Sequence, residues 1–167
     1  MPFHDLTLRS ITEADMGFLR ALYGSTREDE LRRVPWERAA KDAFLDQQFA
    51  AQHGYYQAHY QGADFSLILK GDQPIGRLYL FRGPVTYNLI DIALLAEWRG
   101  RGIGSHLLEQ VLAEADAQGC SIRLFVEPEN PARRLYERLG FRETGRHQVY
   151  LQMSRGALSP LELETTA

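Results

Sequence analysis

The sequence has a single cysteine, Cys120, and no long run of apolar residues. One cysteine excludes a disulfide within the chain, which fits a reducing compartment. A membrane-spanning helix needs about 18 consecutive apolar residues, so we expect no membrane partner. The start of the chain, MPFHDLTLRS, lacks the apolar core of a secretory signal. Together these absences predict a cytoplasmic protein.

A large excess of charge is also missing. The net charge is -3, from 19 basic and 22 acidic residues, so we expect no nucleic-acid partner.

A length of 167 residues with 44% apolar content is typical of one globular domain with a sizeable core. We expect this domain to span residues 1–154. The end, ALSPLELETTA, lacks helical periodicity, and residues 155–167 are predicted to form a loose tail.

Two helices are predicted in the first third of the chain. Thr12 and Asp15 resemble a capping box, with Asp in the position that Glu usually takes, ahead of an amphipathic stretch. Pro35 suits the first position of a second helix. We expect that helix to run to about His53 and to break or bend at Gly54.

Apolar runs separated by turn residues predict a sheet. The expected strands are Leu6–Ser10, Phe65–Lys70, Ile75–Arg82, Tyr87–Leu95 and Ile122–Val126, with closing strands at Phe141 and His147–Met153. The short connections after the second and third of these strands predict antiparallel neighbours. A helical pattern over residues 103–115 separates the fourth strand from the fifth, and such a crossover makes two strands parallel.

Three alternating glycines mark the turn that follows the fourth strand. Gly100, Gly102 and Gly104 let backbone N–H groups approach a ligand closely, because glycine has no Cβ. The helix that begins here adds unpaired N–H groups and the positive end of its dipole. Arg99 and Arg101 add positive charge. This turn is therefore predicted to hold an anion such as a pyrophosphate.

Two common nucleotide motifs do not fit this turn. A P-loop needs Lys and Ser or Thr directly after its glycines, and these are absent. A dinucleotide fingerprint needs a third glycine where Ser105 stands, and it normally follows the first strand of a domain.

Two segments resemble the GCN5-related N-acetyltransferase (GNAT) family. The segment RGRGIG at 99–104, preceded by AEW, is similar to the family's Arg/Gln-x-x-Gly-x-Gly/Ala motif. The segment NPARRLYERLGF at 130–141 is similar to its Asn, Leu-Tyr and Gly-Phe signature. The resemblance implies an acyl-CoA N-acyltransferase fold: an α/β domain (α+β type) with a mixed, mainly antiparallel, twisted sheet flanked by helices.

The resemblance also implies acetyl-CoA as the cofactor. The backbone of Ile92, Ala93 and Leu94 would pair with its pantetheine arm, and Asn130 would contact it further along. The pyrophosphate would lie on the turn, at Arg99, Gly100, Arg101, Gly102, Ile103, Gly104 and Ser105. In the family the fourth and fifth strands splay apart and leave a cleft for the thioester.

The chemistry requires an acid and a base but no metal. Tyr136 matches the family's proton donor, although its position on an apolar helix face also suits a core residue. Asp91 and Glu127 are the candidate bases, and either could instead be an ordinary solvated carboxylate. His147 could line the acceptor site or be structural. Cys120 is not expected to form an acetyl-enzyme, because it lies at a helix-to-strand junction.

Three functions remain open at this point. The protein could acetylate a small-molecule amine, acetylate a peptide or protein amine, or bind acyl-CoA without catalysis. The aromatic segment 55–60 is either core packing or one wall of an acceptor pocket, and a closed pocket would favour a small amine. Formation of a homodimer is also left open.

Overall fold

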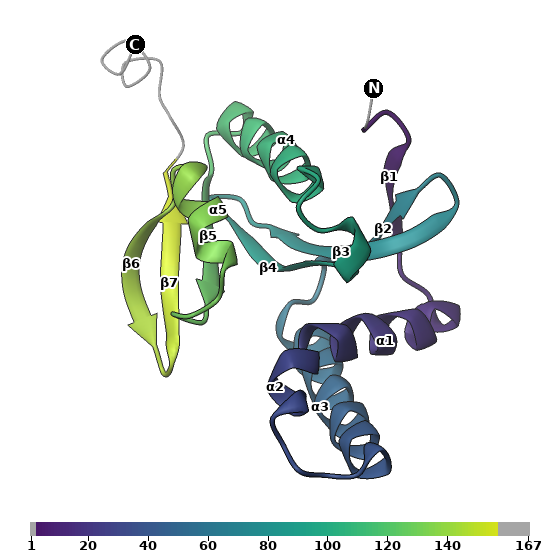
Figure 1. Cartoon of the computed structure of the whole chain (residues 1–167). Coiled ribbons are helices and arrows are strands. Elements are labelled where there is room, and N and C mark those ends of the chain that lie inside the picture. Colours follow the sequence, from purple (N-terminus) through teal and green to yellow (C-terminus); the bar gives the residue numbers. More distant parts are fainter. Residues whose placement is uncertain (1–2, 157–167) are drawn as a thin grey trace. The chain divides into compact units, whose positions relative to one another are not determined.

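The computed structural model describes residues 3–156; the end of the predicted tail, residues 157–167, lies outside the described residues. Seven strands form one sheet in the order β1-β2-β3-β4-β5-β7-β6 (Figure 1). The pairs β1/β2, β5/β7 and β6/β7 are antiparallel, whereas β4 and β5 are parallel. The predicted α/β class with a mixed, mainly antiparallel sheet is confirmed, and so is the parallel pair across the crossover.

The chain divides into two compact units. Among the described residues, unit 1 comprises residues 3–79 and 91–101, and unit 2 comprises residues 80–90 and 102–156. Strands β3 (Gln73–Arg82) and β4 (Thr86–Leu94) contribute residues to both units. The single domain expected over residues 1–154 stays a prediction.

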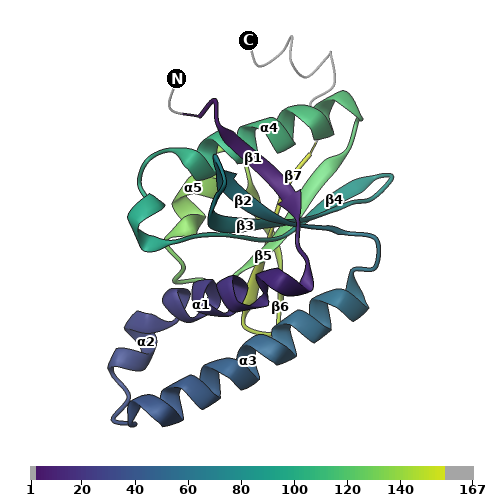
Figure 2. The same cartoon turned by 90° about the vertical axis from the view of Figure 1, so that its right-hand side faces the viewer.

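Unit 1 contains all the described helices that precede the second strand. Its other elements are β1 (Leu6–Ser10), η1 (Glu13–Asp15), α1 (Met16–Thr26), α2 (Glu28–Arg32), α3 (Arg38–His59), β2 (Asp64–Lys70) and η2 (Ala96–Trp98). Helix α1 lies beside α3 in both Figure 1 and Figure 2. Their apolar faces bury Leu19, Tyr23, Leu45 and Phe49 in a core that also includes Leu67 of β2.

Helix α3 departs from the sequence prediction at both ends. It begins at Arg38 rather than Pro35. A helix starting at Pro35 would need Val34 as its cap, but an apolar side chain cannot accept a backbone N–H, and Val34 packs against the core instead. The helix also continues through Gly54 to His59. One glycine costs a helix only about 1 kcal/mol, which neighbouring packing can offset.

The aromatic segment 55–60 is consequently the last part of α3 and not a separate element. The Tyr56 ring packs edge-on against Tyr79 of β3, with ring centroids 6.1 Å apart. Tyr55 is 55% exposed and stacks on His59 at 4.8 Å. The packing interpretation therefore fits Tyr56, whereas Tyr55 faces solvent.

Unit 2 surrounds the parallel pair of strands. Its remaining elements are α4 (Ile103–Ala117), β5 (Ser121–Val126), α5 (Ala132–Arg138), β6 (Arg142–His147) and β7 (Tyr150–Arg155). The prediction of one strand over His147–Met153 is wrong, because the β6–β7 hairpin turns there. Gln148 takes a left-handed conformation at φ 54°, and His147 pairs with Tyr150 across the turn. Within residues 3–156, no helix is both long and apolar enough to cross a membrane.

The predicted capping box at the start of the first helical segment is present. The Thr12 backbone N–H donates to the Asp15 carboxylate at 2.8 Å, and the Arg9 guanidinium donates to both of its oxygens at 3.0 Å. These hydrogen bonds, from Arg9 above all, lower the pKa of Asp15 to about 2. Because they favour the ionised form, Asp15 stabilises the fold above its ordinary pKa of 3.8, and this effect is lost as the pH falls through 2.

We predict that Asp15→Ala lowers the free energy of unfolding at pH 7 by ~1 kcal/mol, the usual effect of losing a cap. Urea unfolding at several pH values measures this. The difference from the original protein should shrink as the pH falls below 4 and approaches 2. Glu13→Ala, a neighbouring exposed carboxylate, is the control and should change little. A loss of stability that does not depend on pH would contradict the role of the Asp15 charge.

Candidate active site

The turn between η2 and α4 has the backbone that its glycines predict. Gly100 and Gly102 have positive φ values of 72° and 82°. Gly102 is the residue that caps α4. The first backbone hydrogen bond of the helix runs from His106 N–H to the Gly102 carbonyl at 3.0 Å. The N–H groups of residues 103–105 therefore precede the helical hydrogen-bond ladder, and they suit the oxygens of a phosphate group.

Two arginines and a tryptophan flank this turn in unit 1. Arg99 donates from Nε to the Leu94 carbonyl at 2.9 Å. The Arg101 guanidinium lies over the Trp98 ring, 4.7 Å from its centroid. Trp98 Nε1 is buried and lacks a hydrogen-bond partner within residues 3–156. An unpaired buried donor is costly, so the orphaned N–H fits a site that binds an oxygen-rich ligand.

In unit 2, α4 is held by ion pairs at its C-terminal half. Arg82 of β3 donates to Glu114 at 2.6 Å, and the Tyr87 hydroxyl donates to the same carboxylate at 2.7 Å. Arg82 lowers the pKa of Glu114, whereas the bond to Glu114 raises the pKa of Tyr87. Arg155 of β7 makes a bidentate pair with Asp116 at 2.8 and 3.0 Å. These contacts fix α4, whose first turn follows the glycines.

Strand β4 carries the residues expected to contact the cofactor's arm. Its parallel register with β5 runs from Thr86–Ser121 to Leu89–Leu124. Ile92, Ala93 and Leu94 therefore lie beyond the last pair of that register, and each is half-buried. The expected divergence of the two strands stays a prediction.

Asp91 proves to be part of a buried ion pair in unit 1. Its carboxylate accepts from Arg77 Nε at 2.6 Å, and Arg77 also donates to Gln52 Oε1 at 2.9 Å. The Arg77 side chain is only 5% exposed, against 30% for Asp91. Sequence reasoning missed Arg77, although an arginine inside an otherwise apolar strand was a signal that it needed a buried acidic partner.

Unit 2 holds the other predicted catalytic and cofactor-binding side chains. Tyr136 on α5 is 7% exposed, and its ring lies 5.9 Å from that of Phe141. Glu127 follows β5 directly and is exposed. The side-chain oxygen of Asn130 accepts from the Ala132 backbone N–H at 2.9 Å, at the start of α5. Its contact with a cofactor stays a prediction.

Two further candidates can be placed. The His147 ring lies 6.2 Å from the ring of Phe125, on the β5–β7–β6 part of the sheet. The Cys120 thiol is 3% exposed and points at backbone carbonyls, with Sγ 3.5 Å from the Pro84 oxygen. A thiol held this way is a poor nucleophile, in agreement with the expectation that it forms no acetyl-enzyme.

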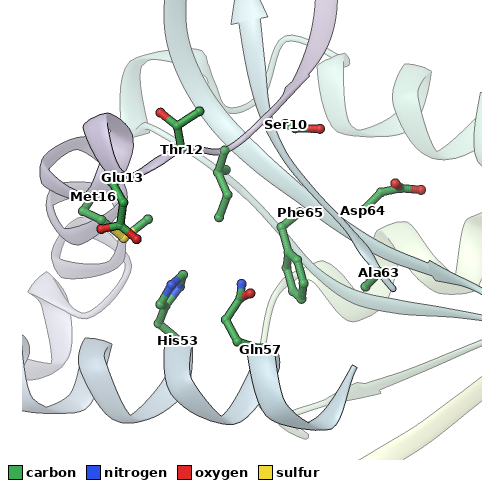
Figure 3. A pocket seen from close by; sticks show the side chains of 10 residues that line it. Ser10, Thr12, Glu13, Met16, His53, Gln57, Ala63, Asp64 and Phe65 are labelled. Atoms are coloured by element: carbon green, nitrogen blue, oxygen red, sulfur yellow. The ribbon is translucent and has the colours of Figure 1, made fainter. Parts of the chain in front are cut away.

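A pocket of about 270 Å³ lies in unit 1 and is lined by residues between Ser10 and Phe65 (Figure 3). His53 and Gln57 of α3, Phe65 of β2 and Glu13 of η1 are among the side chains that line it. None of the predicted site residues does so. Across the described residues, no group of three or more His, Cys, Asp or Glu is arranged to hold a metal ion.

The glycine turn and the N–H groups at the start of α4 thus suit a phosphate-bearing ligand in an α/β protein. The sequence matches the model of the acetyltransferase (GNAT) family over residues 19–141, more than half of the chain and across both units. The chain therefore belongs to the GNAT family of acetyltransferases.

Individual relatives agree with this assignment. Mycothiol acetyltransferase from Acidothermus cellulolyticus is 33% identical over 113 residues, which are 65% of this chain and 33% of that protein. The chain thus spans about a third of the length of this curated relative. The structure of PaiA N-acetyltransferase from Thermoplasma acidophilum with coenzyme A superimposes with a TM-score of 0.67, at 15% identity over 90% of this chain and 98% of that one.

A second solved structure has a similar fold. The acetyltransferase from Thermus thermophilus gives a TM-score of 0.66 at 20% identity, covering 93% of this chain and 99% of that one. At these identities the two structural likenesses establish the fold, and the family assignment rests on the sequence match.

We predict different effects for alanine at two glycines of the turn. Gly102→Ala should destabilise the protein by about 1–2 kcal/mol, because a Cβ strains the left-handed conformation. Gly104 lies in the first turn of α4, and its nearest contact for an added Cβ is Leu135 Cδ2 at 3.7 Å. Gly104→Ala should therefore not lower the stability, because alanine favours the helix more than glycine does. Urea unfolding of both variants checks this. Equal losses of stability in the two variants would show that the left-handed conformation of Gly102 is not the cause.

Proposed function

We propose that this protein is an acetyl-CoA-dependent N-acetyltransferase that transfers the acetyl group directly to a primary amine. The observation that carries the proposal is the left-handed glycine turn at the N-terminus of α4, within a chain of the GNAT family. The expected cytoplasmic location and the single domain over residues 1–154 belong to the same proposal. A homodimer is not required for it.

Coenzyme A is bound through backbone groups for most of its length. The amides of the turn, from Gly100 to Ser105, receive the pyrophosphate oxygens, and Arg99 and Arg101 add positive charge. The backbone of Ile92 to Leu94 pairs with the pantetheine arm. The end of the β4–β5 register at Leu89 supports this role, because the arm needs a stretch of strand beyond the paired residues. Asn130 contacts the cofactor further along.

The bound cofactor supplies a thioester whose carbonyl carbon forms a bond with the amine nitrogen while the C–S bond breaks. Tyr136 gives its phenolic proton to the leaving sulfur. A carboxylate takes the proton that the amine nitrogen loses. The buried position of Tyr136 on α5 supports the role, since packing holds the side chain in one position.

Of the two candidate bases, Glu127 fits the role better. One oxygen of Asp91 already accepts a hydrogen bond from Arg77 at 2.6 Å, so this carboxylate is engaged in holding β4. Glu127 lies at the exposed end of β5, where an amine arriving from solvent can meet it. Asp91 then acts mainly on the conformation of β4.

The acceptor is a small-molecule amine or a peptide amine. The similarity to mycothiol acetyltransferase covers only part of that larger protein, and its acceptor is not transferred to this chain. The deciding measurement is thiol release from acetyl-CoA with a panel of amino acids, polyamines, amino sugars and N-terminal peptides. Coenzyme A binding without turnover on any acceptor would instead support a non-catalytic acyl-CoA-binding module.

We predict that Tyr136→Phe lowers kcat by about 100-fold, the range expected for loss of a general acid, without changing the affinity for coenzyme A. Steady-state kinetics and isothermal titration calorimetry measure the two quantities. Tyr87→Phe is the matched control, because Tyr87 is also buried in unit 2 and its hydroxyl bonds to Glu114, at the other end of α4 from the glycine turn. Unchanged turnover in Tyr136→Phe would remove this residue from the mechanism.

The two carboxylates should separate in kinetics. Glu127→Gln is expected to lower kcat by about 100-fold and to leave the KM for acetyl-CoA unchanged, because a base acts only in the chemical step. Asp91→Asn should raise the KM for acetyl-CoA and lower the thermal stability, since it leaves the buried Arg77 without its charge partner. A lower kcat in Asp91→Asn together with a raised KM for acetyl-CoA in Glu127→Gln would make Asp91 the base.

A further inference from the structure

Three consecutive residues of β3 hold the end of β4 in unit 1. They are Ile75, Gly76 and Arg77, which we call the β3 seat. The first contact is a backbone hydrogen bond in which Leu95 N–H donates to the Ile75 carbonyl at 2.8 Å. This bond ties the chain directly after β4 to the neighbouring strand.

The second contact is a close approach of two backbones at Gly76. A Cβ at this position would overlap the Ala93 carbonyl oxygen, and it would lie 2.8 Å from Leu94 Cδ2 and 3.2 Å from Leu94 Cα. Two of these atoms belong to the backbone and cannot move without displacing β4. A glycine inside a strand weakens the strand, and it commonly marks a place where another backbone comes close. Gly76 is therefore required by the position of Ala93 and Leu94.

The third contact is the ion pair of Arg77 with Asp91. Burial lowers the pKa of Arg77, but the charge of Asp91, the nearby Tyr79 and the hydrogen bond to Asp91 together raise that pKa above its usual value. The guanidinium also lies over the Tyr79 ring at 4.6 Å and donates to Gln52 of α3. Because its partners come from β4 and α3, Arg77 fixes where β4 lies relative to the helix.

We propose that the β3 seat positions Ile92 to Leu94 for the pantetheine arm of acetyl-CoA before the cofactor arrives. Ile75, Gly76 and Arg77 are thus positioning residues, which act through the backbone of β4. This inference rests on the proposed function. The three contacts lie at Leu95, Ala93 and Asp91, so they bracket the residues whose backbone pairs with the cofactor. A misplacement of ~1 Å in such a site can cost about 100-fold in rate.

The direct test is Gly76→Ala, with coenzyme A binding measured by isothermal titration calorimetry. We expect Kd to rise by about tenfold or more, because the new methyl group pushes Ala93 and Leu94 out of place. Gly54→Ala is the matched control. An added Cβ at Gly54 meets nothing within 4 Å, so this variant should bind coenzyme A like the original protein.

A second variant keeps the inference testable if Gly76→Ala does not fold. Arg77→Lys keeps the charge but cannot bond to Asp91 and Gln52 together. We expect the KM for acetyl-CoA to rise severalfold with a smaller change in kcat. Arg20→Lys is the matched control, since Arg20 also pairs with an aspartate, Asp46, and donates to the Asp42 carbonyl of α3. If Arg77→Lys and Arg20→Lys had the same KM for acetyl-CoA, the proposed role of the β3 seat would be contradicted.

Hydrogen exchange of the unmodified protein gives a third measurement. If the seat is preformed, the Leu95 amide exchanges slowly in the free protein and coenzyme A does not slow it further. Protection that appears only with coenzyme A would overturn the inference. The outcomes are distinguishable: an unmodified protein that fails to bind coenzyme A refutes the proposed function and the seat with it. Normal affinity in a folded Gly76→Ala refutes the seat alone.

Discussion

The candidate site depends on the backbone conformation of the turn between η2 and α4. Two glycines with positive φ make the change of direction possible without the strain that any other residue would meet. The same geometry leaves the first amides of α4 outside the helical ladder. The structural need for a sharp turn and the chemical need for N–H donors toward phosphate are therefore met by one arrangement of the backbone.

Such a turn binds a ligand well only if the elements on each side are fixed. In unit 2, the carboxylates of Glu114 and Asp116 hold α4 through arginines from β3 and β7. In unit 1, β4 is held by the contacts at Gly76 and Arg77. Preorganisation of this kind matters because a backbone site cannot adjust side-chain rotamers to recover lost contacts. In the proposed function, the charged residues that fix these elements thus contribute to binding without touching the ligand.

Local signals allowed much of this to be predicted from the sequence. The capping box at Thr12 and the left-handed glycines both depend on residues within a few positions of one another. The β6–β7 hairpin was missed because its turn contains no glycine and Gln148 carries the positive φ instead. The start of α3 was misplaced because Pro35 lacked a cap, a requirement that the proline signal alone does not reveal.

The contacts at Gly76 and Arg77 could not be predicted, because they join residues about 14 to 17 positions apart whose register is set by the folded sheet. A glycine and an arginine inside an apolar strand were visible as exceptions to the pattern, but their partners were not.

The ion pair of Arg77 with Asp91 also affects which carboxylate is proposed as the base. The Asp91 carboxylate accepts from a buried arginine and so holds β4, whereas Glu127 lies exposed directly after β5. In the proposed mechanism, the strand that holds the cofactor and the carboxylate that accepts the proton are therefore separate parts of the protein. Mutations that alter one can leave the other intact, so binding and chemistry can be changed independently.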